Sequence, residues 1–339
     1  MHMADALLSP TMGGIMWAAS AVTTFYCARK IQNRLDDKKI PLMGVLGAFV
    51  FAAQMINFAI PGTGSSGHLG GGLLLAIILG PHAAFLVLSS VLFVQALFFA
   101  DGGLLALGCN IFNLGFFPCF VAYPFIYKNI TGTHPNQLKL VIGSILAALI
   151  GLQLGSFAVV VQTYFSGISA LPFSSFLIMM QPIHLAIGFV EGLATFGVIS
   201  FIWKARPELL DGTINEQHPG SLPIRNLILC MLAATALTGG VLAWFASENP
   251  DGLEWSIEKV TGGTELKNHD QTMHNKLESI QKKTSMMADY SFRETDGEHK
   301  PSAAETRKGT TVAGLFGGFL VLSLGVIMGI ILKKRNFTA

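Results

Sequence analysis

Charged residues are scarce in this sequence. Only 12% of its 339 residues are Asp, Glu, Lys or Arg, and 51% are hydrophobic. A soluble domain carries about 25% charged residues, so this composition excludes an ordinary soluble fold. Cysteine is scarce as well: the four cysteines lie in or beside apolar runs, and none is spaced as CxxC. We therefore expect them to pack as small hydrophobic side chains, with no disulfide and no thiolate metal site.

Motifs of catalysis and nucleotide binding are also missing. The sequence has no HExxH, no Ser–His–Asp order and no set of paired carboxylates. Its glycine-rich stretch at 62–72 is not followed by the Lys and Ser/Thr of a phosphate-binding loop. We therefore expect no enzymatic activity, no bound organic cofactor, no nucleic-acid partner and no use of ATP by this chain alone. The first residues also lack the basic and apolar regions of a secretory signal peptide.

Long apolar runs are abundant, and runs of about 20 residues can cross a bilayer as helices. They lie at about 11–30, 41–60, 69–80, 82–100, 104–127, 138–164, 177–203, 224–246 and 313–332. The third is too short to span comfortably. The pattern predicts an all-α polytopic membrane protein in the lipid bilayer, with a dense seven-helix unit at 1–205, a cytoplasmic linker at 206–222 and a second unit at 223–339. There, two helices flank an external loop at 247–312. Its polar stretch at 268–283 predicts a solvated helix or partial disorder, and its histidines are expected to be solvated.

The distribution of basic residues predicts the orientation, because short cytoplasmic loops are enriched in Lys and Arg. With nine spans and an external N-terminus, every basic residue outside the long loop falls on the cytoplasmic side: Arg29, Lys30, Arg34, Lys38, Lys39, Lys128, Lys139, Lys204, Arg206, Arg225, Lys333, Lys334 and Arg335. The turns at 61–68, 101–103 and 166–175 contain none. We therefore expect a multi-pass protein of the cell (inner) membrane with a cytoplasmic C-terminus. Asp5 and Asp101 are expected near the outer interface, where charge costs little.

The first two residues form a candidate metal chelate. The α-amine of Met1, the peptide nitrogen of His2 and the His2 imidazole can close two fused rings on one metal ion. Nitrogen donors in one plane suit Ni(II) or Cu(II). His68, which follows a glycine-rich turn on the same predicted outer face, offers a fourth nitrogen. The sequence thus predicts a metal site where an importer would meet its substrate.

Four further polar residues are candidates for supporting this site. Gln54 and Asn57 end the second apolar run just before the glycine-rich turn, and amides can orient a ligating imidazole. His184 and Glu191 lie on one face of a predicted membrane helix, where an ionisable side chain indicates function. A hydrogen-bond network that locks the helices together is an equal alternative for this second pair.

Five segments together resemble a known family. They are MHMADALLSP at 1–10, AQMINF at 53–58, GHLGG at 67–71, HLAIGFVEGLAT at 184–195 and NPDGLE at 249–254. The first four resemble the cobalt/nickel substrate-binding subunits (CbiM/NikM) of energy-coupling-factor (ECF) transporters. The last resembles the PDGLE segment of their small NikN/CbiN-like auxiliary subunits. The chain is therefore similar to a fused protein of the NikMN type, with the substrate-binding fold of those transporters in its first unit.

The resemblance implies a transported Ni(II) or Co(II) held by the amine of Met1, the backbone nitrogen and imidazole of His2, and the imidazole of His68. It also implies a membrane coupling subunit and cytosolic ATPases as partners. We expect the coupling subunit to contact small residues of the first helices, such as Ala21, Gly44 and Gly47. The family pattern has Ile-Pro at positions 3–4 and Pro-Val at 59–60, where this chain differs.

Two other functions stay open at this stage. A vitamin-binding subunit of the same transporter type would need an aromatic-lined cavity and no metal nitrogens. An intramembrane metal sensor or enzyme would use His184 and Glu191 instead of the N-terminus. Four nitrogens in one plane favour Ni(II) over Co(II), and Cu(II) fits the same geometry with higher affinity.

Overall fold

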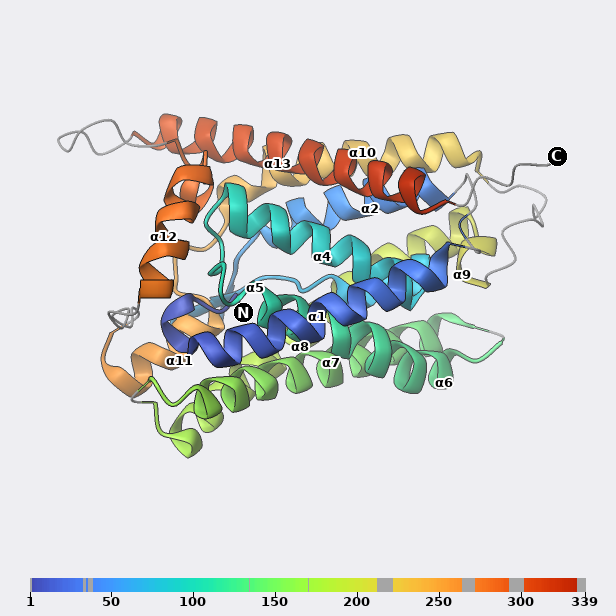
Figure 1. Cartoon of the computed structure of the whole chain (residues 1–339). Coiled ribbons are helices and arrows are strands. Elements are labelled where there is room, and N and C mark those ends of the chain that lie inside the picture. Colours follow the sequence, from blue (N-terminus) through green and yellow to red (C-terminus); the bar gives the residue numbers. More distant parts are fainter. Residues whose placement is uncertain are drawn as a thin grey trace.

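The computed structural model describes residues 2–32, 35, 39–133, 135–169, 171–211, 222–263, 272–292 and 302–333. Six helical segments in it are long and apolar enough to cross a membrane: α4 (Pro81–Phe98), Leu107–Thr131, α7 (Gln137–Ser166), α8 (Phe173–Ala205), Ile224–Phe245 and α13 (Ala303–Leu332). These helices run side by side (Figure 1). The predicted all-α, multi-pass membrane architecture is confirmed.

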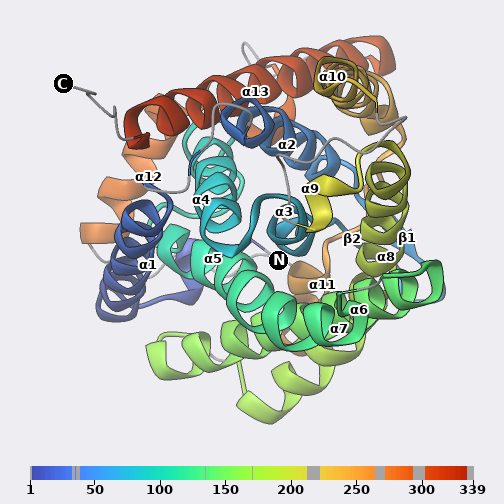
Figure 2. The same ribbon diagram turned by 90° about the vertical axis from the view of Figure 1, so that its right-hand side faces the viewer.

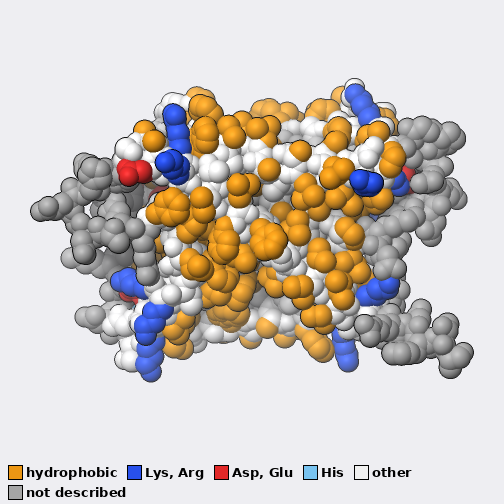
Figure 3. All heavy atoms as spheres, turned by 90° about the horizontal axis from the view of Figure 1, so that it is seen from above, with side chains coloured by type: hydrophobic (Ala, Val, Ile, Leu, Met, Phe, Trp, Pro, Cys, Tyr) orange, Lys and Arg blue, Asp and Glu red, His pale blue; other side chains and the backbone are white. Residues whose placement is uncertain are grey.

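The surface agrees with helices that span a bilayer. Viewed over α13 and α10 (Ile224–Gly240), hydrophobic side chains cover the middle of the molecule, and Lys and Arg side chains gather toward both ends (Figure 3). An apolar band bounded by charged residues is the pattern that a hydrocarbon layer between two aqueous phases requires. We refer to the two ends by the short helices that mark them, the α12 end and the α9 end.

The first two helices lead to the expected turn, but the second is shorter than predicted. Helix α1 (Pro10–Ile31) begins at Ser9, whose hydroxyl accepts a hydrogen bond from the amide of Met12. Helix α2 (Lys39–Gln54) ends six residues before the predicted boundary. The chain there forms an antiparallel hairpin of β1 (Phe58–Ile60) and β2 (Ser65–Gly67). Two turn glycines with positive φ make this reversal possible, so apolar residues 58–60 form a strand instead of extending the helix.

Helix α3 (Gly72–Leu79) is the centre of the bundle. All eight of its residues are buried, and the axial view shows it enclosed by the longer helices (Figure 2). Gly71 and Gly80, with φ of 74° and 83°, flank it. A Cβ at Gly71 would lie 2.5 Å from Val50, so only glycine fits there. The short third run is therefore a core helix reached from the α12 end, and α4 returns to that end.

The next span is wound unusually. Helix α5 (Leu107–Ile111) continues into a π-helix, η2 (Phe112–Tyr127), and then α6 (Lys128–Thr131). Pro118 and Pro124 lie inside η2, where each removes a backbone donor. Pro118 packs on Gly72, whose added Cβ would lie 3.1 Å from the proline ring. This irregular span therefore fits closely against the start of α3.

The second unit packs on the first through glycines. Within the second unit, a Cβ at Gly314 of α13 would lie 2.3 Å from the carbonyl oxygen of Gly239 in α10. Between the units, a Cβ at Gly325 would lie 2.9 Å from the Cα of Gly44 in α2. A Cβ at Gly47 would lie 2.9 Å from Val87 of α4 and 3.0 Å from Val321 of α13. The expectation that Gly44 and Gly47 face a partner subunit is therefore wrong, because α13 already covers them.

The segment that connects α10 to α13 is more ordered than its composition predicted. It forms η3 (Leu242–Phe245), α11 (Gly252–Thr261), α12 (Thr272–Thr284) and η4 (Ala288–Tyr290), and α13 begins at Ala303. Helix α12 stands across the end of the bundle (Figure 1). His274 was expected to be solvated, but it is fully buried, and its Nε2 donates to the carbonyls of Asp5 and Leu8 at 3.1 and 2.9 Å. His269 and His299 lie outside the described residues.

At the α9 end, the predicted linker begins with buried charge. Arg206 and Glu208 form an ion pair and are 2% and 0% exposed, and α9 (Glu208–Asp211) follows directly. The Arg206 guanidinium also donates to the carbonyl of Leu222 at 2.8 Å. The start of the linker thus belongs to the packed bundle, and residues 212–221 lie outside the described part of the chain.

Candidate metal centre

A cavity of about 410 Å³ opens at the α12 end and brings together residues from both units. Its lining includes four of the residues singled out from the sequence, together with side chains that sequence reasoning missed. The lining residues are His2, Ala4, Gln54, Met55, Asn57, His68, Ala100, Asp101, Gly102, Asp251, Glu254, Asp289 and Tyr290. Four of these described residues are carboxylic acids and none is Lys or Arg, so the cavity favours a cation.

The two histidines expected to bind metal meet in this cavity. The rings of His2 and His68 stack with centroids 4.9 Å apart and an interplanar angle of 7°. The His2 backbone is fixed by its neighbour: the Met3 amide donates to Asn110 Oδ1 at 2.8 Å, and the Met3 carbonyl accepts from Gly103 at 2.9 Å. Met1 lies outside the described residues. The N-terminal segment thus holds the His2 side chain at a defined place in the cavity.

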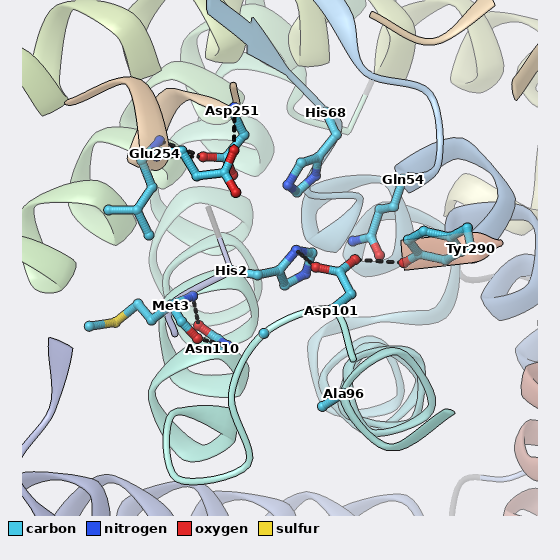
Figure 4. A network of polar contacts seen from close by, with 12 residues as sticks. His2, Met3, Gln54, His68, Ala96, Asp101, Asn110, Asp251, Glu254 and Tyr290 are labelled. Atoms are coloured by element: carbon cyan, nitrogen blue, oxygen red, sulfur yellow. Dashed lines mark hydrogen bonds and ion pairs between the residues drawn. The ribbon is translucent and has the colours of Figure 1, made fainter. Parts of the chain in front are cut away.

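His2 is also held through its side chain (Figure 4). Its Nδ1 lies 3.0 Å from Asp101 Oδ1, and the Tyr290 hydroxyl donates to Asp101 Oδ2 at 2.6 Å. Burial acts to raise the pKa of Asp101, but its contacts with the His2 ring and the Tyr290 hydroxyl hold this pKa below its ordinary value. The Asp101 carboxylate is therefore ionised at neutral pH. His2 Nε2 is buried and has no hydrogen-bond partner among the described residues.

The turn that carries His68 is held by two side chains from separate helices. Gln54 donates from Nε2 to the Gly70 carbonyl at 2.8 Å. Glu191 accepts from the amides of Gly70 and Gly71 at 2.9 and 3.0 Å, and so satisfies two donors at the start of α3. Both residues thus support the turn that carries His68.

The His68 imidazole is 8% exposed, and its Nδ1 lies 3.1 Å from the Leu69 carbonyl. Burial lowers the pKa of His68 to about 3. The ring is therefore neutral throughout the physiological pH range. Neutral imidazole is the form that coordinates a metal ion.

The NPDGLE segment covers the hairpin beside His68. The amide of Ser66 donates to the Pro250 carbonyl at 2.8 Å, and the Trp255 indole donates to the Thr63 carbonyl at 3.0 Å. Asp251 begins α11 and accepts from the Glu254 amide at 2.8 Å, while Glu254 closes the capping box. Both carboxylates lie near His68 in Figure 4. Burial and the nearby Asp251 charge raise the pKa of Glu254.

His184 and Asn57, which were expected to support the site, make their hydrogen bonds away from the two histidines. His184 is fully buried in α8, where its Nδ1 donates to the Met180 carbonyl at 2.8 Å, and a Cβ on Gly252 would lie 3.2 Å from its ring. It thus packs beneath the PDGLE segment. Asn57 lines the cavity mouth, and its carbonyl accepts from the Ser247 amide at 2.7 Å.

Sequence reasoning misjudged the two outer aspartates and missed two residues of the second unit. Asp5 is buried, and its Oδ1 accepts from the Ala106 amide at 3.0 Å, so it is a structural cap and not a cheap interfacial charge. Burial raises the pKa of Asp5. Asp101 contacts His2 directly. Asp251 lies in the NPDGLE motif, but nothing in that motif indicated a place beside His68. Tyr290 is 189 residues from Asp101 in sequence, and no local pattern marks it.

The described residues contain no group of three or more His, Cys, Asp or Glu side chains arranged to hold a metal ion. Two imidazoles converge in the anionic cavity.

Comparison with known proteins identifies the family of both units. The family model described as the cobalt uptake substrate-specific transmembrane region, CbiM, matches residues 2–209, and the model of the PDGLE domain matches residues 225–334. The provisionally named fused nickel transport protein NikMN of Archaeoglobus fulgidus is 32% identical over 330 residues, which is 96% of this chain and 97% of that protein. The cobalt transport protein CbiM of Geobacter sulfurreducens is 27% identical over 278 residues, 77% of each chain.

A solved structure is similar as well. The crystal structure of a transition metal transporter matches with a TM-score of 0.54 and 31% sequence identity, and the match covers 63% of this chain and 97% of that one.

Proposed function

Because the chain belongs to the CbiM family of cobalt-uptake substrate-specific transmembrane proteins and also carries a PDGLE domain, we propose that it captures Ni(II), or Co(II), through its N-terminus and two histidines. It is a substrate-specific component of a cobalt/nickel transport system. The observation that supports the proposed site is the convergence of His2 and His68, with ring centroids 4.9 Å apart, in a cavity whose described lining includes four carboxylic acids and no Lys or Arg.

The proposed ligands are the α-amine of Met1, the peptide nitrogen and imidazole of His2, and the imidazole of His68. The Met1 amine and the two His2 nitrogens follow one another along the chain, so they close small chelate rings that hold the three donors in a plane. A planar set of four nitrogens suits Ni(II) better than Co(II). The acidic side chains around the site, Asp251 and Glu254 among them, attract the cation to the cavity mouth.

This lining disfavours the other two functions. A vitamin-like substrate would need a mostly apolar or aromatic wall, whereas Tyr290 is the only aromatic ring besides the two histidines among the described lining residues. An enzyme or sensor built on His184 and Glu191 would need them to share a site. Instead, His184 packs under Gly252, and Glu191 accepts hydrogen bonds from the turn before α3.

The orientation that suits an importer places the α12 end outside a cell membrane. The helix ends at the α9 end carry Lys39, Lys128, Lys139, Lys204 and Arg225. Enrichment of short loops in Lys and Arg marks the cytoplasmic side. The cavity would then open to the medium from which metal is taken up.

We propose energy-coupling-factor partners for the transport step. The sequence contains no nucleotide-binding motif, so a membrane coupling subunit and cytosolic ATPases must supply the driving force. Their contact surface remains on α1, where Ala18 and Ala21 are exposed.

The test measures equilibrium Ni(II) and Co(II) binding to purified protein whose N-terminus is free. His2→Ala and His68→Ala should each lower Ni(II) affinity at least about a hundredfold, since a four-coordinate site has no spare donor. His82→Ala, a half-buried histidine at the start of α4, is the matched control and should bind normally.

An N-terminal extension of two residues should abolish the planar Ni(II) spectrum, and the same extension at the C-terminus should not. An amide nitrogen is a far poorer donor than a free amine, which is the reason for the difference. Unchanged Ni(II) affinity in the N-terminally extended protein would contradict the four-nitrogen site.

A further inference from the structure

The side chain of His2 is engaged by an acidic side chain of the cavity. Its Nδ1 contacts Asp101 Oδ1 at 3.0 Å, and the other oxygen of Asp101 accepts from the Tyr290 hydroxyl at 2.6 Å. Tyr290 comes from η4 of the second unit, so this chain of contacts joins a proposed metal ligand of the first unit to the second (Figure 4).

This contact conflicts with the proposed coordination. A metal ion bound to the peptide nitrogen of His2 can be reached by the same residue's imidazole only through Nδ1, which is attached to Cγ and closes a six-membered ring. Nε2 lies on the far side of the ring. The nitrogen that the chelate needs is therefore the one that Asp101 holds, while Nε2 has no partner among the described residues.

We propose that Asp101 is a latch on the metal-free site, that Tyr290 is its positioning residue, and that the latch must release His2 Nδ1 before the metal ion is fully coordinated. The inference rests on the proposed four-nitrogen site. On release, the Nδ1 proton is lost, Nε2 takes up a proton and the metal–Nδ1 bond forms, so the imidazole stays neutral. No other reactant is needed.

The backbone around the latch is built to hold it. Among the described residues other than glycine, only Ala100, Asp289 and Tyr290 have positive φ, at 55°, 51° and 56°. Ala100 directly precedes Asp101, and Asp289 directly precedes Tyr290, the tyrosine that binds Asp101. Such conformations are unfavourable and persist only where the surroundings fix them, which is common at sites that switch.

Backbone hydrogen bonds fix these two segments against each other. The amide of Met287 donates to the Phe98 carbonyl at 3.2 Å, and the amide of Asp289 donates to the Phe99 carbonyl at 2.9 Å. In addition, Gln281 of α12 donates to the carbonyls of Ala96 and Gly102 at 2.9 and 2.8 Å. The second unit thus sets the position of the loop that carries Asp101, and through it the rate at which His2 becomes available.

The experiment measures the rate of metal loading by stopped-flow absorbance after the full-length protein with a free N-terminus is mixed with excess Ni(II). Asp101→Ala and Asp101→Asn both remove the carboxylate charge, so attraction of the cation changes equally. Only Asn keeps an oxygen that can hold the Nδ1–H group. The latch predicts that Asp101→Ala loads about three- to tenfold faster than Asp101→Asn, since one neutral hydrogen bond separates them.

Tyr290 is tested without any change of charge. Tyr290→Phe should load about two- to tenfold faster than wild type, because the carboxylate loses its anchor. The matched control Tyr164→Phe, at an exposed tyrosine of α7, should load at the wild-type rate. In an Asp101→Ala background, Tyr290→Phe should add nothing, because Tyr290 acts only through Asp101.

Two results would overturn the latch. One is an equal loading rate for Asp101→Ala and Asp101→Asn, together with no effect of Tyr290→Phe. The other is a fall of about 10–100-fold in equilibrium Ni(II) affinity for Asp101→Ala, which is expected if the carboxylate orients His2 for coordination through Nε2. Failure of the proposed site itself is separate, since it would appear as normal Ni(II) binding by His2→Ala.

Discussion

Glu191 shows how a single buried side chain supports the cavity without touching the metal. Its two carboxylate oxygens accept from the amides of Gly70 and Gly71, which lie two and three residues beyond His68. Removing them leaves two buried donors unsatisfied, at about 1–3 kcal/mol each. Glu191→Ala should lower the free energy of unfolding by about 2–4 kcal/mol and weaken Ni(II) binding by displacing the His68 turn. Denaturant titration in detergent and equilibrium Ni(II) binding measure the two effects.

The matched control is Glu278→Gln in α12, whose carboxylate pairs with exposed Lys282. Exposed ion pairs contribute about 0–1 kcal/mol, so this variant should unfold like wild type. If Glu191→Ala is as stable as Glu278→Gln, the carboxylate does not hold the start of α3.

Metal binding should release protons from the N-terminus and not from His68. Burial lowers the pKa of His68 to about 3, so this ring is already neutral between pH 5 and 8 and releases no proton when metal binds. The released protons must come from the α-amine, whose ordinary pKa is about 7.7–8.0, and from the peptide nitrogen of His2. Metal binds the deprotonated nitrogens, so Ni(II) affinity should fall as pH drops below about 7.7, with more than one proton released per metal ion. Calorimetry in buffers of different ionisation enthalpy counts these protons, and an affinity that stays constant from pH 5 to 8 would contradict the assignment.

At the same scale, the sequence could identify the proposed ligands but not the residues that hold them in place. His2 and His68 lie in short, unusual motifs that chemistry makes readable. Asp101 and Tyr290 are 189 residues apart, and only packing of the second unit on the first brings them together. A polar stretch with no apolar periodicity gives no sign that one of its residues is buried against a distant loop, which is also why His274 was misjudged.

At the scale of helices and strands, the long spans were predictable because an apolar run must be about as long as the bilayer is thick. The exceptions have local causes. Residues 58–60 are apolar enough to extend α2, but the glycines at 62 and 64 turn the chain back as a hairpin. Helix α13 begins ten residues before its apolar run, because Ser302 and Glu305 form a capping box in the polar part. At both places, local turn or capping residues decide where the helix ends or begins, and the extent of the apolar run does not.

Helix packing between α10 and α13 offers a matched pair of glycines. A Cβ at Gly314 would lie 2.3 Å from the Gly239 carbonyl oxygen, whereas the nearest atom to a Cβ at Gly318 is a Thr235 methyl at 3.7 Å. Gly314→Ala should therefore destabilise the protein by about 1–3 kcal/mol through overpacking. Gly318→Ala should be neutral or stabilise by up to about 1 kcal/mol, since alanine favours helix over glycine. Circular dichroism during thermal unfolding distinguishes them, and equal melting temperatures would show that α10 can move away from α13 freely.

At the scale of the whole molecule, the two family segments form one packed body. Helices α10 and α13 lie along α2, and α12 crosses the end of the bundle (Figures 1 and 2). Sequence could separate the two units by composition, but it could not show how they meet. In lipid, a helix face that contacts another helix is as apolar as one that contacts acyl chains, so periodicity does not distinguish them.

This packing predicts that the covalent connection is dispensable for assembly. Residues 212–221 join the units, while the contacts that hold them lie elsewhere, in the Gly44–Gly325 crossing, in the hydrogen bonds of Met287 and Asp289, and in the cover of α11 over the hairpin. Two chains, 1–211 and 222–339, expressed together should therefore copurify when only the second is tagged, and the pair should bind Ni(II) like the intact protein. Gly325→Leu in the second chain is the control: its side chain would meet the Gly44 backbone, at 2.9 Å already for a Cβ, and should reduce recovery of the first chain about tenfold or more. Loss of copurification without that substitution would mean that the tether, and not the helix packing, holds the second unit over the cavity.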